Sequence, residues 1–209
     1  MFRWQSVMEL ATVYRWTQRI LGGEAVHRYF VDRHVRARPG DRLLDIGCGP
    51  AQILERLPSV GYVGVDLNPR YIATAQARYG ERGVFVCQSV SQMAIEHPHS
   101  FDLVLAHGLI HHLENTEAQQ LFETAALALK PGGRFVTMDG CFVPGQSKVA
   151  QWMLKNDRGQ FVRNEEGYLA LANRVFPEVR AIVRHDLLRI PYTHIMLECQ
   201  VPSTQNIRT

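Results

Sequence analysis

An α/β fold, with a mostly parallel sheet and helices on both of its faces, is the fold class that this 209-residue sequence predicts. Two observations carry the prediction. Short apolar segments alternate with amphipathic ones from Arg42 onwards, and a glycine-rich turn directly follows the first apolar segment. Strands that alternate with helices form covered parallel sheets, and such sheets bind ligands at the carboxyl ends of their strands. We therefore look for function just after each strand.

The expected elements follow in order. The chain starts with helices at about 2–21 and 24–36, and Pro39 and Gly40 end the second. Hydrophobic periodicity predicts strands at 42–46, 62–66, 84–87, 101–106 and 134–139, and helices at 52–57, 69–79 and 116–129. Further helices are expected at 146–156 and 165–176, and strands at 179–187 and 194–199. These last two strands, separated by Pro191, are expected to pair as a hairpin at the sheet edge.

Composition narrows the class of protein. A hydrophobic fraction of 46%, with no apolar stretch of membrane-spanning length, predicts one soluble domain. The net charge of +3 comes without a basic run, so nucleic acid is not the expected partner. The four cysteines are far apart in the sequence, which argues against a zinc site or a disulfide framework and favours a cytoplasmic location.

The loop at residues 45–49, with the sequence DIGCG, is the strongest local signal. Gly47 and Gly49 stand where a buried strand turns into a helix, and only glycine lets that backbone approach a ligand closely. The third glycine of a dinucleotide fingerprint is missing, and Asp45 would repel a pyrophosphate. A carboxylate there would instead attract a cationic amino-acid group. Asp66, after the next strand, suits the two hydroxyls of a ribose, which does not distinguish one adenosine cofactor from another.

Four motifs in this order resemble those of class I S-adenosylmethionine-dependent methyltransferases, in particular the small bacterial "type 11" members. They are DIGCG at 45–49, VD at 65–66, FDLVL at 101–105 and LKPGG at 129–133. The resemblance covers about 41–139. It implies a Rossmann-like, seven-stranded, mostly parallel sheet with a reversed C-terminal strand. It also implies S-adenosylmethionine (SAM) as cofactor and S-adenosylhomocysteine as product.

The resemblance also assigns a cofactor site, residue by residue. Asp45, Gly47, Cys48 and Gly49 would line the methionine end of SAM, Asp66 would bind the ribose, and Leu67 would pack beside the adenine. Residues after the third and fourth strands would complete the pocket, namely Ser89, Val90, Ala106 and His107. Ser89 stands where many relatives have an acid, and its hydroxyl would have to supply the hydrogen bond to the adenine amino group.

Candidates for chemistry follow the fourth and fifth strands. Methyl transfer from a sulfonium needs mainly in-line positioning of the acceptor. His107 is a candidate for cofactor contact, His111 or His112 for acceptor binding or proton removal, and Asp139 for orienting an acceptor hydroxyl or amine. Packing and capping roles for the histidines and a solvated carboxylate at Asp139 are the structural alternatives. No metal is expected, because no acid accompanies the histidines at ligand spacing.

The acceptor site is expected from segments outside the cofactor motifs. Arg158 and Arg163 would read a carboxylate or phosphate on the acceptor, and Tyr192 and His194 would reach the same mouth. A surface ion-pair network is the alternative for the arginines. Tyr14 would cap the cofactor from an N-terminal helical lid, with plain helix packing as its alternative.

The full prediction is a single methyltransferase domain over 1–209, with a lid at 1–38, the SAM core at 41–139 and acceptor-side helices and a hairpin at 140–209. It would methylate an O, N or C atom of a small molecule, and the arginines suggest an anionic group on that acceptor. A nicotinamide-dependent oxidoreductase and a SAM-binding protein without transferase activity are the alternatives. RNA and protein substrates are less expected, because the sequence has no appended recognition domain and no basic stripe. The oligomeric state does not follow from the sequence.

Overall fold

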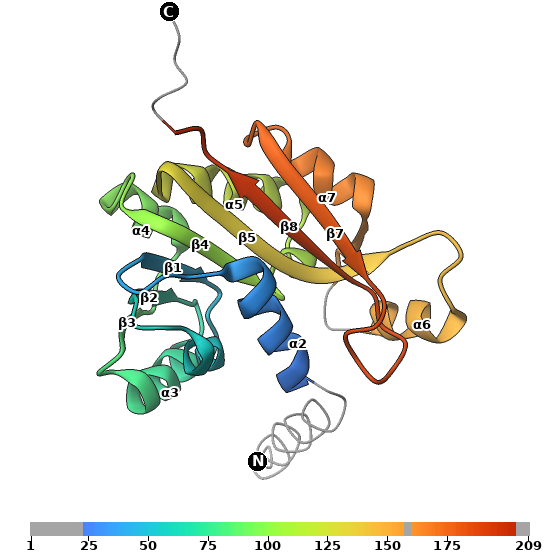
Figure 1. Ribbon diagram of the computed structural model, residues 1–209, viewed down its shortest axis with the longest axis horizontal. Helices are drawn as coiled ribbons and strands as arrows, with labels where there is room; N and C mark the ends of the chain where they lie inside the picture. The colour runs from blue at the N-terminus through green and yellow to red at the C-terminus, as the bar shows by residue number, and fades with distance from the viewer. Residues whose placement is uncertain (1–22, 157–159, 204–209) are drawn as a thin grey trace, which may run out of the picture.

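The computed structural model describes residues 23–156 and 160–203, which fold as one α/β unit (Figure 1). The main sheet has the order β3-β2-β1-β4-β5-β8-β7, and a short β6 pairs with β5 outside that path. The strands are β1 (Arg42–Ile46), β2 (Gly61–Val65), β3 (Gly83–Val86), β4 (Phe101–His107), β5 (Leu129–Phe142), β6 (Arg163–Asn164), β7 (Glu178–Arg184) and β8 (His194–Gln200). The helical segments are α2 (Gly23–Phe30), η1 (Val31–Val35), η2 (Gln52–Arg56), α3 (Pro69–Tyr79), α4 (Val90–Glu96), η3 (Ile110–His112), α5 (Asn115–Ala128), α6 (Lys148–Asn156) and α7 (Glu165–Ala172).

The sheet confirms the predicted topology. Strands β1 to β5 of the main path pair in parallel, whereas β8 runs antiparallel to both β5 and β7. The reversed strand therefore lies inside the sheet, and β7 forms the edge of the expected hairpin. The two-residue β6 was not predicted, because so short a strand leaves no periodic pattern.

Helices cover both faces of the sheet and create two cores. On one face α4, α5 and α7 bury side chains that include Met93, Phe122 and Tyr168. On the other face α2, η2 and α3 bury Phe30, Leu54 and Ala75, among others. A fully buried apolar side chain contributes roughly 1.5–3 kcal/mol, so these two cores hold the strand ends in fixed positions.

Strand register brings the functional ends together. Ile46 at the end of β1 pairs with Val65 of β2 on one side and with Ala106 of β4 on the other. His107 in turn pairs with Met138 of β5. The residues that follow β1 and β2, together with the ends of β4 and β5, therefore share one edge of the sheet.

Further parts of the fold also differ from the sequence prediction. The helix α4 was not predicted, and Ser89 caps its start by accepting a hydrogen bond from the Gln92 N–H at 3.4 Å. Strand β5 begins at Leu129, earlier than predicted, because the chain turns at Gly132 (φ 77°) and stays beside β4. The predicted helix at 2–21 lies outside the described residues. Within the described part of the chain, every helix is too short or too polar to cross a membrane.

Candidate active site

The loop after β1 is held open by its backbone. Gly47 and Gly49 have φ values of 67° and 53°, in the left-handed region that favours glycine. The N–H groups of Gly47 and Cys48 both donate to Val65 O, at 2.8 and 3.1 Å. A Cβ atom on Gly49 would meet nothing within 4 Å, whereas one on Gly47 would lie 3.1 Å from the Leu109 side chain. The loop thus offers an open edge at Gly49 with Leu109 packed beside Gly47.

Asp66 ties this loop to the next one. Its Oδ2 accepts a hydrogen bond from Gly49 N–H at 3.0 Å, and its Oδ1 accepts one from Asn68 N–H at 2.7 Å. A carboxylate oxygen has two lone pairs, so each oxygen can accept one further donor. The carboxylate that is expected to hold a ribose is thereby already oriented by the two loops around it.

Asp45 is buried at the end of β1. Tyr62 Oη donates a hydrogen bond to Asp45 Oδ2 at 2.5 Å. Burial raises the pKa of Asp45 to about 7, since the Tyr62 hydrogen bond, which lowers it, offsets only part of the desolvation. Burial also raises the pKa of the Cys48 thiol, so that Cys48 stays a neutral, weakly polar neighbour of the loop.

The remaining predicted cofactor residues differ in how exposed they are and in whether their polar groups already have partners. Leu67 is 75% exposed, which is unusual for a large apolar side chain and leaves it free to pack on a flat ring. Ser89 is the N-cap of α4 and Val90 is the first residue of that helix, so the hydroxyl of Ser89 already has a backbone partner. Ala106 is fully buried within β4.

These residues fit a SAM-like molecule by their chemistry. An open glycine edge, two carboxylates and an exposed leucine match a cationic amino acid, a ribose and an adenine in turn. Asp45, Gly49, Asp66 and Leu67 are the residues that would hold them.

His107 ends β4 among other aromatic rings. Its ring lies 4.9 Å from the His27 ring in an edge-on arrangement and 5.4 Å from the Phe30 ring, measured between centroids. Burial, together with the nearby His27, His194 and His111, lowers the pKa of His107 to about 3. His107 is therefore a neutral hydrogen-bonding group at physiological pH, not a cation.

His111 and Asp139 form a buried pair. The His111 Nδ1 and Asp139 Oδ1 atoms are 2.7 Å apart, and the His111 backbone N–H donates to the same oxygen at 3.2 Å. Burial raises the pKa of Asp139, while the His111 hydrogen bonds lower it in part. Asp139 Oδ2 is buried with no hydrogen-bond partner among the described residues. A carboxylate on Nδ1 fixes the tautomer in which Nε2 carries a lone pair, as a general base requires.

Arg163 packs against the loop that carries His111. Its guanidinium donates to the backbone oxygens of Ile110 at 3.1 Å, Leu113 at 2.8 Å and Phe161 at 3.0 Å. Two further bonds, at 3.0 and 2.9 Å, go to Asn115 Oδ1. Arginine has five N–H donors, and all five are engaged here. Arg163 therefore holds the 110–115 loop, and the prediction that it also reads an acceptor anion stays untested.

Of the other predicted acceptor residues, the structure describes Tyr192 and His194. The Tyr192 and His194 rings lie 4.7 Å apart, and a Cβ on Gly140 would lie 2.6 Å from Tyr192 Oη. This places Tyr192 against Gly140 of β5, on the face of the strand opposite to the Asp139 side chain. Tyr14 and Arg158 lie outside the described residues. Among residues 23–156 and 160–203, no group of histidine, cysteine and acidic side chains is arranged to hold a metal ion.

Three neighbours of the site were not predicted from the sequence. Tyr62, Leu109 and His27 contact Asp45, Gly47 and His107 respectively. Tyr62 and Leu109 stood within or beside recognised motifs but looked like ordinary core residues, and His27 lies in a helix far from the motifs in sequence. A signal existed only for Tyr62, because a polar aromatic residue in a buried strand needs a hydrogen-bond partner.

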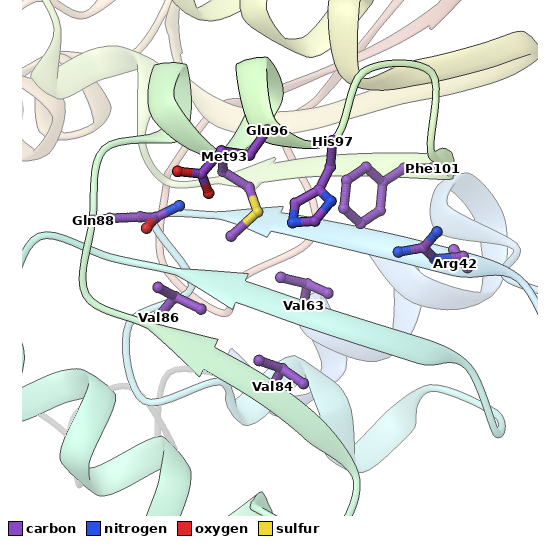
Figure 2. A pocket seen from close by; sticks show the side chains of 9 residues that line it. All are labelled: Arg42, Val63, Val84, Val86, Gln88, Met93, Glu96, His97 and Phe101. Carbon is purple, nitrogen blue, oxygen red and sulfur yellow. The ribbon is translucent and has the colours of Figure 1, made fainter.

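A separate cavity of about 310 Å³, which has neither His111 nor Asp139 in its lining, lies beside α4 (Figure 2). It is enclosed by α4 on one side and the sheet on the other, and its lining is mostly apolar. The lining residues are Arg42, Val63, Val84, Val86, Gln88, Met93, Glu96, His97 and Phe101. It contains none of the predicted cofactor, catalytic or acceptor residues.

Comparison with known proteins supports the resemblance drawn from the motifs. Residues 44–137, somewhat less than half of the chain, match the sequence model of a family described as "Methyltransferase domain". This match, together with the relatives and solved structures described below, supports the resemblance of the chain to class I SAM-dependent methyltransferases. The match begins one residue before Asp45 and ends two residues before Asp139, so it contains the glycine loop, Asp66, His107 and His111. The match agrees with the resemblance drawn from the motifs and favours a methyltransferase over a nicotinamide-dependent oxidoreductase.

Curated relatives of this chain include ubiquinone biosynthesis O-methyltransferases. The protein of Xanthomonas euvesicatoria pv. vesicatoria is 35% identical over 100 residues, which are 46% of this chain and 41% of the relative. That of Burkholderia thailandensis is 27% identical over 177 residues, covering 77% of this chain and 75% of the relative. The chain thus matches less than half the length of the first of these relatives.

Solved structures share the fold. Phosphoethanolamine N-methyltransferase 2 of Haemonchus contortus superposes with a TM-score of 0.69 at 20% identity, over 88% of this chain and 54% of that one. Geranyl diphosphate C-methyltransferase of Streptomyces coelicolor has a TM-score of 0.67 at 16% identity, over 85% of this chain and 75% of that one. The cyclase SpnF has a TM-score of 0.69 at 15% identity, over 85% and 80% of the two chains. One fold therefore serves several reactions, and the acceptor has to be inferred from the site.

Proposed function

We propose that this protein transfers a methyl group from SAM to a hydroxyl group of a small molecule and releases S-adenosylhomocysteine. SAM supplies a methyl group that is already activated for transfer. The single observation that carries the choice of an oxygen acceptor is the buried His111–Asp139 pair, with 2.7 Å between Nδ1 and Oδ1. A hydroxyl must lose its proton to become a strong nucleophile, and a histidine oriented by a carboxylate is suited to take it.

The proposed base, His111, sets how acidic the acceptor hydroxyl must be. The unperturbed histidine pKa is about 6.5 and that of a phenol about 10, a gap that one positioned base can bridge during the transfer. An aliphatic alcohol is far less acidic. We therefore propose a phenolic hydroxyl, and the O-methyltransferase relatives support an oxygen acceptor.

Each predicted residue has a role in this proposal. Asp45, Gly47, Cys48 and Gly49 would surround the methionine end of SAM, Asp66 the ribose and Leu67 the adenine, with Ser89, Val90 and Ala106 around the rest of the pocket. His107, neutral at physiological pH, would accept or donate a hydrogen bond near the methyl group. Tyr192 and His194 would border the acceptor. Tyr14 would cover the site from the segment 1–38, with 41–139 as cofactor core and 140–209 as acceptor side.

We propose Arg158 as the residue that would bind an anionic group on the acceptor. The five donors of Arg163 already have partners, and His107 carries no charge near pH 7. Arg158 is therefore the residue that would pair with a carboxylate or phosphate on the acceptor.

The test measures cofactor binding and transfer separately. Calorimetry with S-adenosylhomocysteine reports the cofactor site, and transfer of a labelled methyl group from SAM is followed on a panel of phenols, with primary amines as comparison. Replacing Asp139 with Asn should lower kcat at least about 100-fold, the scale of general-base catalysis, and leave S-adenosylhomocysteine affinity unchanged. The matched control is Asp102→Asn, since Asp102 lies at the opposite end of β4, where it pairs with Lys130 at 2.7 Å. Binding without transfer to any hydroxyl would favour a SAM-binding protein that lacks this activity.

A further inference from the structure

A tyrosine from the neighbouring strand reaches the buried acid of the cofactor loop. Tyr62 lies near the start of β2, only 2% of its surface is exposed, and its hydroxyl donates to Asp45 Oδ2 at 2.5 Å. Strand register pairs Asp45 with Gly64, not with Tyr62. The Tyr62 ring must therefore extend along the sheet, towards the carboxyl ends of the strands, to meet Asp45.

Two glycines make room for that path. A Cβ on Gly64 would lie 3.0 Å from Tyr62 Cε1, and one on Gly83 of the adjacent strand would lie 2.9 Å from Tyr62 Cδ1. Both separations are too short for a side chain to fit without displacing the ring. Neither glycine has the positive φ that would explain its presence by backbone conformation. The space that they leave is filled by the Tyr62 ring.

The hydroxyl of Tyr62 is a dependable donor at this place. Burial and the nearby Asp45 raise the pKa of Tyr62 well above its usual value, so the phenol keeps its proton. Asp45 needs such a donor, because burial and the neighbouring Asp66 carboxylate both favour the protonated form of Asp45. Of these influences, only the Tyr62 hydrogen bond favours the ionised form.

We propose that Tyr62 is a positioning residue that keeps Asp45 ionised and oriented for the ammonium group of the cofactor's methionine moiety. The proposal rests on the proposed function, since it presumes that SAM binds at this loop. The Tyr62 bond occupies Oδ2, and Oδ1 keeps its lone pairs for a cation. A protonated Asp45 would offer no such attraction.

The pH dependence of cofactor binding tests this role. With the pKa of Asp45 at about 7, a cationic ligand binds the ionised form better, so affinity rises as the pH increases towards about 7 and levels off above it. Tyr62→Phe keeps the ring that fills the glycine slot but removes the donor. The pKa of Asp45 then rises, by about one unit for a lost hydrogen bond to a charged group, and the levelling-off point moves up with it. At pH 7 the affinity should fall roughly fivefold, the change in ionised fraction that such a shift produces.

The measurement is S-adenosylhomocysteine affinity by calorimetry from about pH 5.5 to 9, for wild-type and Tyr62→Phe protein. Titration of the Asp45 carboxyl carbon by NMR in the ligand-free protein gives a second readout that needs no cofactor. The matched control is Tyr79→Phe, which removes another phenol, one that bonds Glu55 at 2.5 Å in the same core, and should leave both curves in place. Asp45→Asn should bind weakly and without pH dependence over this range.

The outcomes separate the two proposals. Wild-type protein that binds no S-adenosylhomocysteine at any pH would overturn the proposed function. Binding with the same levelling-off point in both proteins, or a loss in Tyr62→Phe that is equal at every pH, would overturn only the role of Tyr62 and leave it a packing residue. An upward shift of both the binding curve and the carboxyl titration in Tyr62→Phe supports the inference.

Discussion

The Asp66 carboxylate joins the two cofactor loops through its two oxygens. Gly49 N–H and Asn68 N–H donate to its two oxygens, at 3.0 and 2.7 Å. Removing it therefore releases two backbone donors as well as the proposed ribose contact. The two loops would therefore lose their shared hydrogen-bond acceptor even in the ligand-free protein.

We expect Asp66→Ala to weaken S-adenosylhomocysteine binding by about 1–3 kcal/mol, the usual scale for hydrogen-bonding groups left without partners. The fold should persist, because Asp66 is only partly buried and lies outside both cores. Calorimetry on the folded variant measures the change. Asp41→Ala is the control, since Asp41 Oδ2 also accepts a backbone N–H, from Arg38 at 2.7 Å, but precedes β1 at the far end of the strand. An undiminished affinity in Asp66→Ala would remove Asp66 from the site.

Single residues also show what the sequence could reveal. Asp45 and Asp66 were found because a glycine turn and a strand-end acid are local patterns. The Tyr62–Asp45 and His111–Asp139 bonds join residues 17 and 28 positions apart. Such contacts depend on strand register and on which way a ring extends, and a single sequence does not encode either in a local pattern. His111 and Asp139 were both predicted as candidates, but not as partners.

At the scale of elements, local signals decided which predictions succeeded. The helix at 69–79 was predicted with the bounds that α3 has, because Pro69 favours a first turn and Asn68 caps it by accepting from the Arg70 N–H at 3.0 Å. The seven-residue α4 has few buried positions and thus little periodicity, so it was missed. The short β6 exists because it pairs with β5, a tertiary effect.

The Arg163 contacts give a prediction about an element, the loop that carries His111. Arg163→Ala should lower the free energy of unfolding by about 1–3 kcal/mol, because the Ile110 and Leu113 carbonyls lose their donors. It should also lower kcat, since the loop that positions His111 loosens, with little change in the acceptor KM. Urea unfolding and steady-state kinetics measure these effects.

Arg78→Ala is the control for this arginine, since Arg78 forms an exposed ion pair with Glu55 at 3.0 Å, a type worth about 0–1 kcal/mol. The alternative role, in which Arg163 reads an acceptor anion, predicts the opposite pattern. In that case the acceptor KM would rise while stability and kcat stayed near their wild-type values.

The described part of the molecule buries both histidine and aspartate side chains. Burial lowers the pKa of His27, His34 and His107, and it raises the pKa of Asp45 and Asp139. All five groups are therefore shifted towards their neutral forms. The histidines make folding less favourable as the pH falls below about 6.5, whereas the carboxyl groups make it less favourable as the pH rises above about 4. The two sets oppose each other in mildly acidic solution, which limits the pH dependence of wild-type stability.

Removing one of these histidines should change how the stability of the protein depends on pH. The pKa of His107 is about 3 in the folded protein, whereas an unperturbed histidine has a pKa of about 6.5. Between these two pH values the unfolded chain holds a proton that the folded one lacks. Each such proton costs at most about 1.4 kcal/mol of stability per pH unit as the pH falls. His107→Asn should be less stable than wild type near pH 7, because the ring contacts with His27 and Phe30 are lost. This difference in the free energy of unfolding should narrow by about 1–2 kcal/mol near pH 4.5, because only the wild type loses stability through His107 as the pH falls. Urea unfolding at several pH values measures the gap, with the exposed His97→Asn as control. A gap that stays constant from pH 7 to 4.5 would mean that folded His107 takes up its proton as readily as the unfolded chain does, and that the edge of the sheet around it is open to water.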